Sequence, residues 1–286
     1  MIIDVHTHIM TVWEREPFTE NDLLQRMDQL HIDKFVLLPI GVTPDTPYFY
    51  YGTEDVLATY SRHPDRVIPF CMIDPRMGKN SPETDFSWIL SRYAEAGCKG
   101  VGEFTPSLYI NDPKCLNFYK QCAPFSLPII FHLSSQLHGT YGVVDDAGLP
   151  RLEECLQSCP ETTFIIHGPS FWAEIGAGVK EEERGGYPKG PITAPGRTVE
   201  LLQQYPNLYG DLSAGSGFNA FSRDKEFGIS FLEECSDKLL FGTDLCHKNQ
   251  DVPIVPFFEE LKESRAISEK AWTAITEGNA IRLFNL

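Results

Sequence analysis

Eight short apolar segments, each followed by a segment with helical spacing, run along the whole chain. The apolar segments begin near residues 2, 33, 67, 98, 128, 162, 207 and 239. Residues 35–40, Phe-Val-Leu-Leu-Pro-Ile, are almost continuously apolar, which is typical of a strand buried on both faces of a parallel sheet. Strands separated by helices require right-handed parallel crossovers. Eight such units predict an α/β fold of the closed (β/α)8 (TIM) barrel type.

The helical segments have apolar residues three and four apart, as expected of helices that cover a barrel. They are predicted at 20–31, 53–63, 81–96, 112–123, 149–158, 198–205, 223–235, 253–264 and 268–283. A doubly wound open sheet is the structural alternative, but no Gly-x-Gly-x-x-Gly turn follows the first strand. Barrels of this type commonly reach 286 residues as one domain. We therefore expect a single domain, residues 1–286.

The composition excludes some classes of partner. The formal net charge is -16 and no basic cluster stands out, which argues against a nucleic-acid surface and against binding to an anionic membrane. No apolar run approaches the roughly 18 residues that a membrane span needs. The eight cysteines form no Cys-x-x-Cys pair, and no secretory signal precedes the first strand, so reduced thiols and a cytoplasmic location are expected.

Histidines and carboxylates recur where the predicted strands end. The C-terminal ends of all strands in such a barrel meet at one mouth, which is where the active site lies. His6 and His8 are two residues apart on a strand, so both point to the same side. The residues at the other strand ends are Glu103, His132, His167 and Asp244, and the seventh strand ends near Asp211 and Ser213. Four of the eight histidines at strand ends are hard to explain by core packing alone.

With these residues in place, the chain resembles the metal-dependent amidohydrolase superfamily over essentially its whole length. It is most similar to the amidohydrolase-related branch, which includes aminocarboxymuconate semialdehyde decarboxylase and related acid decarboxylases. The segments that carry the resemblance are Ile3-Asp4-Val5-His6-Thr7-His8, His63-Pro64-Asp65-Arg66, Phe131-His132, Ile166-His167-Gly168, Phe241-Gly242-Thr243-Asp244 and Gly278-Asn279-Ala280-Ile281-Arg282-Leu283-Phe284.

The resemblance implies one divalent metal ion, most often zinc, held by His6, His8, His132 and Asp244. Three imidazoles and one carboxylate suit Zn²⁺ or a similar ion such as Mn²⁺ and leave a position for water. Bound metal lowers the pKa of that water to roughly 7, and Asp244 can take its proton and return it to a leaving group. The resemblance makes His167 a catalytic group beside the metal, able to donate a hydrogen bond to a developing oxyanion.

Glu103 departs from the two-metal amidohydrolases, which commonly place a carboxylated lysine at the end of strand four. We therefore expect a single metal ion, with Glu103 left open as a ligand, a bridge or a structural residue. TatD-type deoxyribonucleases, which also begin with His-x-His, hold two metals through such a glutamate. The acidic charge and the lack of basic clusters weigh against a nuclease here.

Substrate contacts are expected from the loops after the strands, which form the rim of the mouth. The candidates are Trp13, Arg15, Phe104, Trp172 and His247. The predicted function is metal-dependent hydrolysis of a small, carboxylated organic molecule, and non-oxidative decarboxylation on the same site is the alternative. A barrel that has lost catalysis would lack ligands, whereas all the expected ones are present. A homodimer is the default expectation for such an enzyme.

Overall fold

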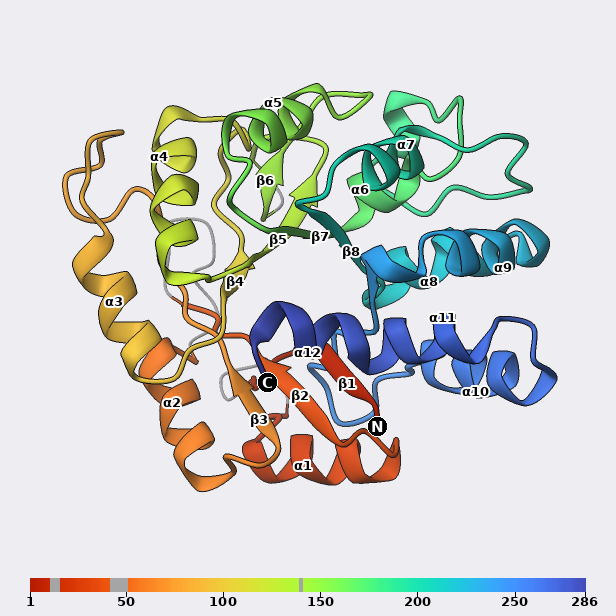
Figure 1. Cartoon of the computed structure of the whole chain (residues 1–286), viewed down its shortest axis with the longest axis horizontal. Coiled ribbons are helices and arrows are strands. Elements are labelled where there is room, and N and C mark those ends of the chain that lie inside the picture. The colour runs from red at the N-terminus through yellow and green to blue at the C-terminus, as the bar shows by residue number, and fades with distance from the viewer. Residues whose placement is uncertain (11–15, 42–50, 139–140) are drawn as a thin grey trace.

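The computed structural model describes residues 1–10, 16–41, 51–138 and 141–286. Trp13 and Arg15 lie outside these ranges. Strands and helices alternate along the chain, and the helices surround the strands (Figure 1). The strands are β1 Ile3–Thr7, β2 Lys34–Leu37, β3 Val67–Pro69, β4 Val101–Phe104, β5 Ile129–Ser134, β6 Val143–Val144, β7 Phe164–His167, β8 Leu208–Asp211 and β9 Leu239–Leu240.

The helices lie close to their predicted ranges. They are α1 Glu20–Gln29, α2 Thr53–Arg62, α3 Ser87–Glu95, α4 Pro113–Cys122, α5 Pro150–Ser158, α6 Pro169–Ala173, α7 Arg197–Gln204, α8 Ala214–Ser222, α9 Lys225–Glu234, α10 Ile254–Ser264, α11 Glu269–Thr273 and α12 Asn279–Phe284. Two differences stand out. Helix α3 begins at Ser87 rather than near residue 81, because Ser81 and Thr84 form a turn and Asp85 accepts a hydrogen bond from the Ser87 amide. Helices α6 and α8 were not predicted.

The strands form a closed parallel (β/α)8 barrel, as the sequence predicts. β1, β2 and β3 pair in that order, and β4, β5, β7, β8 and β9 pair in a second series. Two seams join the series. A bridge between Cys71 and Val101 joins β3 to β4, and the Val5 amide donates to the carbonyl of Phe241, after β9, at 2.9 Å. The short β6 pairs with β5 outside this ring.

Two apolar cores lie on either side of the strand layer. The smaller one holds alternate residues of the barrel strands, such as Val36, Ile68, Ile130 and Ile165, and continues into α12. This core fills the barrel interior, and α12 lies over the middle of the barrel in the view of Figure 1. The larger core lies between the strands and the surrounding helices. Because strand residues alternate between the two sides, His132 and His167 share the inward direction of Ile130 and Ile165.

Irregularities in β1 and β4 turn further site residues inward. Between Asp4 and Thr7, β1 carries one residue more than its partner β2, and β4 carries one more than β5 between Val101 and Phe104. An extra residue of this kind is a β-bulge, which changes the side to which the following side chains point. The bulge in β1 places His6 on the interior side beyond Val5, and the bulge in β4 includes Glu103.

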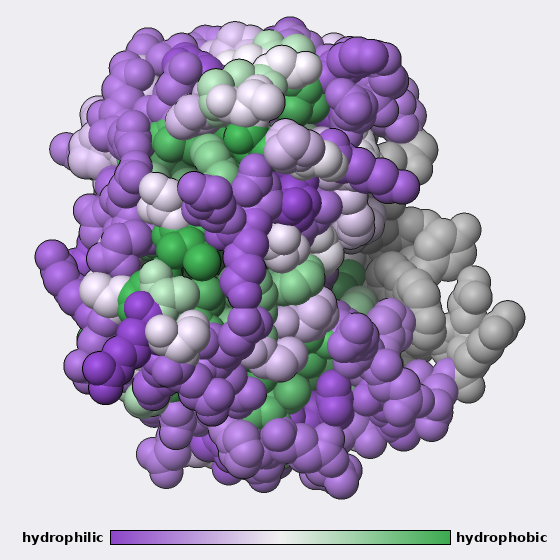
Figure 2. Space-filling view, turned by 90° about the vertical axis from the view of Figure 1, so that its right-hand side faces the viewer, coloured by the Kyte–Doolittle hydropathy of each residue, from purple (hydrophilic) through white to green (hydrophobic). Residues whose placement is uncertain are grey.

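One side of the molecule is mostly hydrophilic. Figure 2 shows one side of the molecule, where hydrophilic residues predominate and hydrophobic ones form separate areas between them. No helix within the described ranges is long and apolar enough to cross a membrane. All eight cysteines are free thiols, and seven of them are buried, in line with the expectation of reduced thiols.

Candidate metal centre

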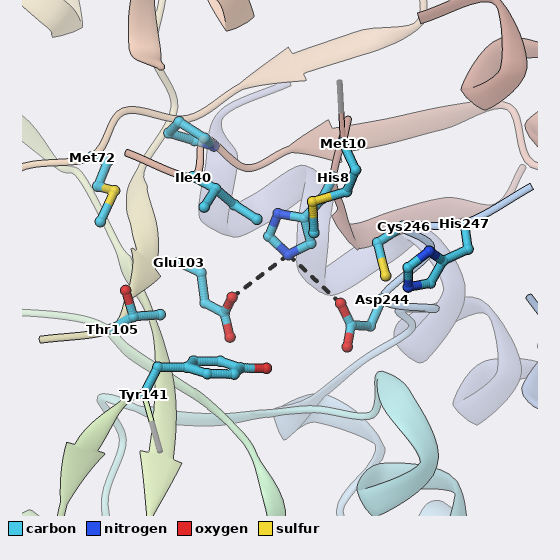
Figure 3. Close-up of a pocket in the computed structure, with 11 residues that line it drawn as sticks. His8, Met10, Ile40, Met72, Glu103, Thr105, Tyr141, Asp244, Cys246 and His247 are labelled. Carbon is cyan, nitrogen blue, oxygen red and sulfur yellow. Dashed lines mark ion pairs between the residues drawn. The ribbon is translucent and has the colours of Figure 1, made fainter. Parts of the chain in front are cut away.

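Four donor atoms converge at the C-terminal end of the barrel. The Nε2 atoms of His6 and His8 are 3.2 Å apart. The Asp244 Oδ1 atom lies 3.7 Å from His6 Nε2 and 3.6 Å from His8 Nε2. The Glu103 Oε2 atom lies 3.8 and 3.6 Å from the same two nitrogens. Figure 3 shows His8 between the two carboxylates, with a dashed line to each.

The spacing and the protonation of this set fit a cation. Atoms bound at about 2.1 Å to one ion in a tetrahedral arrangement lie roughly 3.4 Å apart, close to the 3.2–3.8 Å separations that involve the two Nε2 atoms. The Nδ1 atom of His6 contacts Asp211 Oδ2 at 2.6 Å, and that of His8 contacts the Leu38 carbonyl at 3.2 Å. Both partners accept only, so each Nδ1 carries a hydrogen and each ring turns its Nε2 atom toward the other. Two Nε2 atoms and two carboxylates facing one another favour a positive charge between them, which a proton on His6 or a bound cation can supply.

Burial and neighbouring charge set the pKa values of this group. Burial opposes the charged form of His6, but Asp211 and Glu103 outweigh it and raise its pKa well above the usual range. Burial, and then the charge of His6, lowers the pKa of His8 to about 4. Burial raises the pKa of Asp244 to about 7, with His6 opposing the rise and Glu103 adding to it. A proton on His6 thus supplies positive charge that a bound cation would replace.

The backbone of Asp244 adopts an uncommon conformation. Its φ of 58° lies in the left-handed region, which is uncommon for a residue other than glycine and is often found at functional sites. Its amide donates to the His6 carbonyl at 2.8 Å. Just before it, Thr243 donates through its amide and hydroxyl to the buried carboxylate of Asp4. Asp4 also accepts from the His6 amide, so this carboxylate fastens the ends of β1 and β9 together.

His132 and His167 lie beside this set, and the His167 ring also packs against that of His6, with ring centroids 4.5 Å apart. Donor atoms of His6, His167 and Asp244 all lie within 4.8 Å of one another. His132 Nδ1 contacts Glu103 Oε1 at 2.8 Å, and His167 Nε2 lies 3.9 Å from the same oxygen. The structure thus brings together His6, His8 and Asp244 as expected, with Glu103 in the place where His132 was expected. His167 Nδ1 contacts Ser213 Oγ at 2.8 Å, and its side chain is 2% exposed.

Sequence reasoning assigned no role to Asp211. Its carboxylate is fully buried, contacts His6 through Oδ2 and accepts from the Ser213 amide through Oδ1 at 2.9 Å. Carboxylates that hold the outer ring nitrogen of a metal-ligating histidine fix its orientation and tautomer. Gly242 leaves room for this group, since a Cβ there would lie 2.7 Å from Asp211 Oδ1. The available signal was an acidic residue at the end of the seventh strand.

A cavity of about 210 Å³ opens above the donor atoms. His8, Glu103 and Asp244 form its polar floor, as Figure 3 shows. Its remaining walls are mainly apolar and are formed by Met10, Pro39, Ile40, Met72, Tyr141 and Cys246, with Thr105 and His247 as further polar residues. The cavity can therefore admit a small organic molecule next to the donor atoms.

Three of the expected substrate contacts can be placed. His247 lines the cavity, as expected, and its contact with substrate stays a prediction. The predictions for Phe104 and Trp172 are wrong in position, because both side chains are 1% exposed and neither lines the cavity. Phe104 follows Glu103 and points the opposite way, against Phe118 and other aromatic rings. Trp172 packs in the outer core and donates to the Asp211 carbonyl at 2.8 Å.

Comparison with solved structures shows the same fold at low sequence identity. An uncharacterised TIM-barrel protein from Bordetella bronchiseptica has 16% identity and a TM-score of 0.68, over 99% of this chain and 98% of the other. A dihydroxybenzoic acid decarboxylase from Polaromonas sp. JS666, with bound manganese and the inhibitor 2-nitroresorcinol, has 16% identity and a TM-score of 0.60, over 100% and 97%.

A third similar structure is a probable 2-pyrone-4,6-dicarboxylic acid hydrolase from Acinetobacter baumannii with citric acid bound. It has 15% identity and a TM-score of 0.56, over 100% of this chain and 99% of the other. A search among curated proteins found no match. The amidohydrolase family model matches residues 3–286, almost the entire chain. The chain therefore belongs to the amidohydrolase family, whose members are metal-dependent enzymes of the hydrolase or decarboxylase type.

Proposed function

We propose that this protein is a metal-dependent hydrolase of a small organic substrate. The observation that carries the proposal is the convergence of His6 Nε2, His8 Nε2, Glu103 Oε2 and Asp244 Oδ1 beside an open cavity. His8, Glu103 and Asp244 line that cavity. Nitrogen and carboxylate donors suit Zn²⁺ first, and Mn²⁺ second. Bound manganese in one similar structure supports keeping both ions in the test.

A divalent ion in this position supplies Lewis-acid chemistry, because it lowers the pKa of a water molecule and polarises a carbonyl group. Asp244 is the proton acceptor of the set. Its side chain is 26% exposed to the cavity, whereas that of Glu103 is 8% exposed, so Asp244 can reach both an attacking water and a leaving group. Asp211 and the Leu38 carbonyl keep the two histidine rings in the orientation that presents Nε2.

The size and the apolar walls of the cavity suit a small substrate with an apolar body. Met10, Ile40 and Met72 line one side of it and Tyr141 the other (Figure 3). Among the described residues, His247 is the basic residue of the cavity wall that is not a proposed metal ligand. We infer that an acidic group of the substrate would face His247. His167 does not line the cavity. The proposed role of His167 is therefore exerted on the metal set rather than by contact with the substrate.

Decarboxylation is the second candidate function. Its support is the similar structure named a dihydroxybenzoic acid decarboxylase, together with the apolar walls, which suit an aromatic ring. Both reactions would use the same residues. They differ in product, because decarboxylation releases carbon dioxide and hydrolysis consumes water across an ester, lactone or amide bond.

A substrate panel tests the proposal. The metal-loaded protein is assayed against lactones, esters, amides and hydroxybenzoates, with acid release and carbon dioxide release measured in parallel. Hydrolysis that is lost in His8→Ala and restored to the metal-stripped wild type by added Zn²⁺ or Mn²⁺ is the expected result. Carbon dioxide release alone, with the same metal dependence, would replace hydrolysis by the second candidate. Turnover that persists unchanged in His8→Ala would refute both.

A further inference from the structure

A second cavity lies beside the one above the metal set. Its volume is about 160 Å³, and its walls come from the loop after β3 and from α3. Met72 lines both cavities, so a single residue separates them at that point. The loops after barrel strands form the rim of the mouth, which places the second cavity on the same face of the barrel as the metal set. We call it the outer groove, and its main apolar wall residues are Met72, Met77, Phe86, Trp88, Ile89 and Tyr93.

The surface of the outer groove favours an apolar ligand. Trp88 and Met77 are 66% and 58% exposed, the two largest exposed fractions among the large hydrophobic side chains of the described residues. The polar side chains of the groove already have partners. Asp85 accepts from the first residue of α3, the Thr84 hydroxyl donates to a carbonyl of its own turn, and the Tyr93 hydroxyl donates to a carboxylate of α2. A ligand in the groove would therefore gain from burying apolar surface rather than from charge.

We propose that the outer groove binds an uncharged apolar arm of the substrate, while the reacting group of the same molecule lies at the metal set. The inference rests on the proposed function and narrows its substrate to a compound with an apolar extension. Met72 and His247 lie at opposite ends of the first cavity in Figure 3. An arm that passes Met72 thus leaves the space at His247 for an acidic group.

Met72 is a suitable residue for the boundary between the two cavities. Its side chain is half-buried, and its Sδ atom accepts a hydrogen bond from the Gly41 amide at 3.1 Å. A thioether is a weak acceptor, and the three rotatable bonds of methionine let the side chain adapt to a neighbour. Met72 can therefore turn aside for an alkyl or aryl arm at low cost.

The wall formed by the loop after β3 is held in place by α4. The side-chain amides of Asn117 and Gln121 donate to the Thr84 carbonyl at 2.8 and 2.9 Å. The Gln121 oxygen accepts from the Phe86 amide at 2.7 Å. The Phe86 ring packs edge to face on that of Phe118. Because the groove is preformed, binding an arm costs little ordering of the loop.

The competing explanation is that Met77 and Trp88 form a contact surface for a second copy of the chain. The two explanations differ in their relation to the metal set. An arm-binding groove makes the affinity of a metal-binding ligand depend on the length of its tail, whereas a contact surface between copies does not.

A series of alkyl hydroxamates tests the inference, because the hydroxamate group binds a metal ion and the tail can be varied. The full-length protein loaded with Zn²⁺ is titrated by calorimetry with acetohydroxamate, butyrohydroxamate, hexanohydroxamate and octanohydroxamate. We expect the affinity to rise by up to about fourfold for each methylene that the groove buries. Octanohydroxamate should bind at least about tenfold more tightly than acetohydroxamate.

Variants of the groove separate its effect from that of the apolar walls of the first cavity. Trp88→Glu and Met77→Glu each place a carboxylate in the groove, and both replace exposed side chains, so the fold should be retained. Each should remove most of the gain in affinity with tail length, because an apolar tail would desolvate the new charge. Tyr109→Ala, which replaces an exposed aromatic residue outside both cavities, is the matched control and should keep the gain.

The outcomes that overturn the inference are distinguishable from failure of the proposed function. Equal affinities for all four hydroxamates, or a gain that is unchanged in both groove variants, would remove the groove and leave the proposed function intact. A wild-type dimer that dissociates in Trp88→Glu, with no gain from tail length, would assign the groove to contact between copies. If no hydroxamate binds the protein supplied with Zn²⁺, both the metal site and the groove proposal fail.

Discussion

Replacing Asp211 by asparagine should weaken metal binding while keeping the size and shape of the side chain. Asp211 accepts two hydrogen bonds, from His6 Nδ1 at 2.6 Å and from the Ser213 amide at 2.9 Å. An asparagine has only one acceptor oxygen. If that oxygen faces Ser213, the amide NH2 faces His6 Nδ1 and forces the hydrogen onto Nε2, the atom that must bind the ion. If the asparagine oxygen faces His6 instead, the asparagine NH2 group faces the Ser213 amide N–H, and two donors meet with no acceptor.

The expected loss is about 10- to 100-fold in metal affinity, which corresponds to about 1.4–2.7 kcal/mol. The assay is a titration of the metal-free protein with Zn²⁺ or Mn²⁺ in competition with a chelator of known affinity. Activity at limiting metal should fall in parallel with occupancy. Part of the activity should return when excess metal restores occupancy, because the carboxylate acts through His6 rather than on the substrate.

Asp145→Asn is the matched control. Asp145 is also buried and accepts from the backbone amides of Arg151 and Leu152 at the start of α5, outside the metal set. Its replacement should cost about 1–3 kcal/mol of unfolding free energy without changing metal affinity. Equal metal affinities for folded Asp211→Asn and the wild type would refute the argument from the histidine tautomer.

Three further changes have defined outcomes. Gly242→Ala places a Cβ 2.7 Å from Asp211 Oδ1 and should lower both metal affinity and the unfolding free energy, the latter by about 1–3 kcal/mol. The Arg62 hydrogen bond lowers the pKa of Glu20 to about 2 from an ordinary 4.5, so its stabilisation is present above about pH 4.5 and is lost as the pH falls toward 2. Glu20→Gln should flatten that part of the stability–pH curve. Arg184→Ala removes a fully buried guanidinium and should cost about 3–5 kcal/mol, read from denaturant unfolding.

Two of these changes have matched controls. Gly186→Ala, where a Cβ would lie 3.7 Å from the Glu183 carbonyl oxygen, should leave stability and metal binding near wild type. Asp28→Asn tests the specificity of the acid effect, because Asp28 is largely exposed and its pair with Arg66 is at the surface. A stability–pH curve of Glu20→Gln that parallels the wild type between pH 4.5 and 2 would contradict the assignment to Glu20.

The barrel was predictable because its signals are local. The apolar runs at residues 35–40 and 129–133 are strands buried on both faces, and such runs separated by helical spacing leave few topologies. Helix α8 escaped prediction because its sequence, Ala-Gly-Ser-Gly-Phe-Asn-Ala-Phe-Ser, has two glycines and two serines and therefore weak helix propensity. Packing of Phe221 against α10 supplies what propensity does not.

The site residues were predictable as a set, but their neighbours were not. The C-terminal ends of all strands in a barrel meet at its mouth. His6, Glu103 and Asp244 could therefore be placed at the mouth without knowing how the strands pair. The error at Phe104 was avoidable, since adjacent strand residues point in opposite directions. The role of Asp211 depends on the 2.6 Å contact with His6, which joins residues 205 positions apart and leaves no local pattern in the sequence.

The assignment of His132 shows where such reasoning ends. The position of His132 on its strand is enough to predict that its side chain points inward. The oxygen of Glu103 that His132 contacts depends on the extra residue in β4, because that residue shifts Glu103 relative to β5 between Val101 and Phe104. That shift places the carboxylate between His132 and the pair on β1.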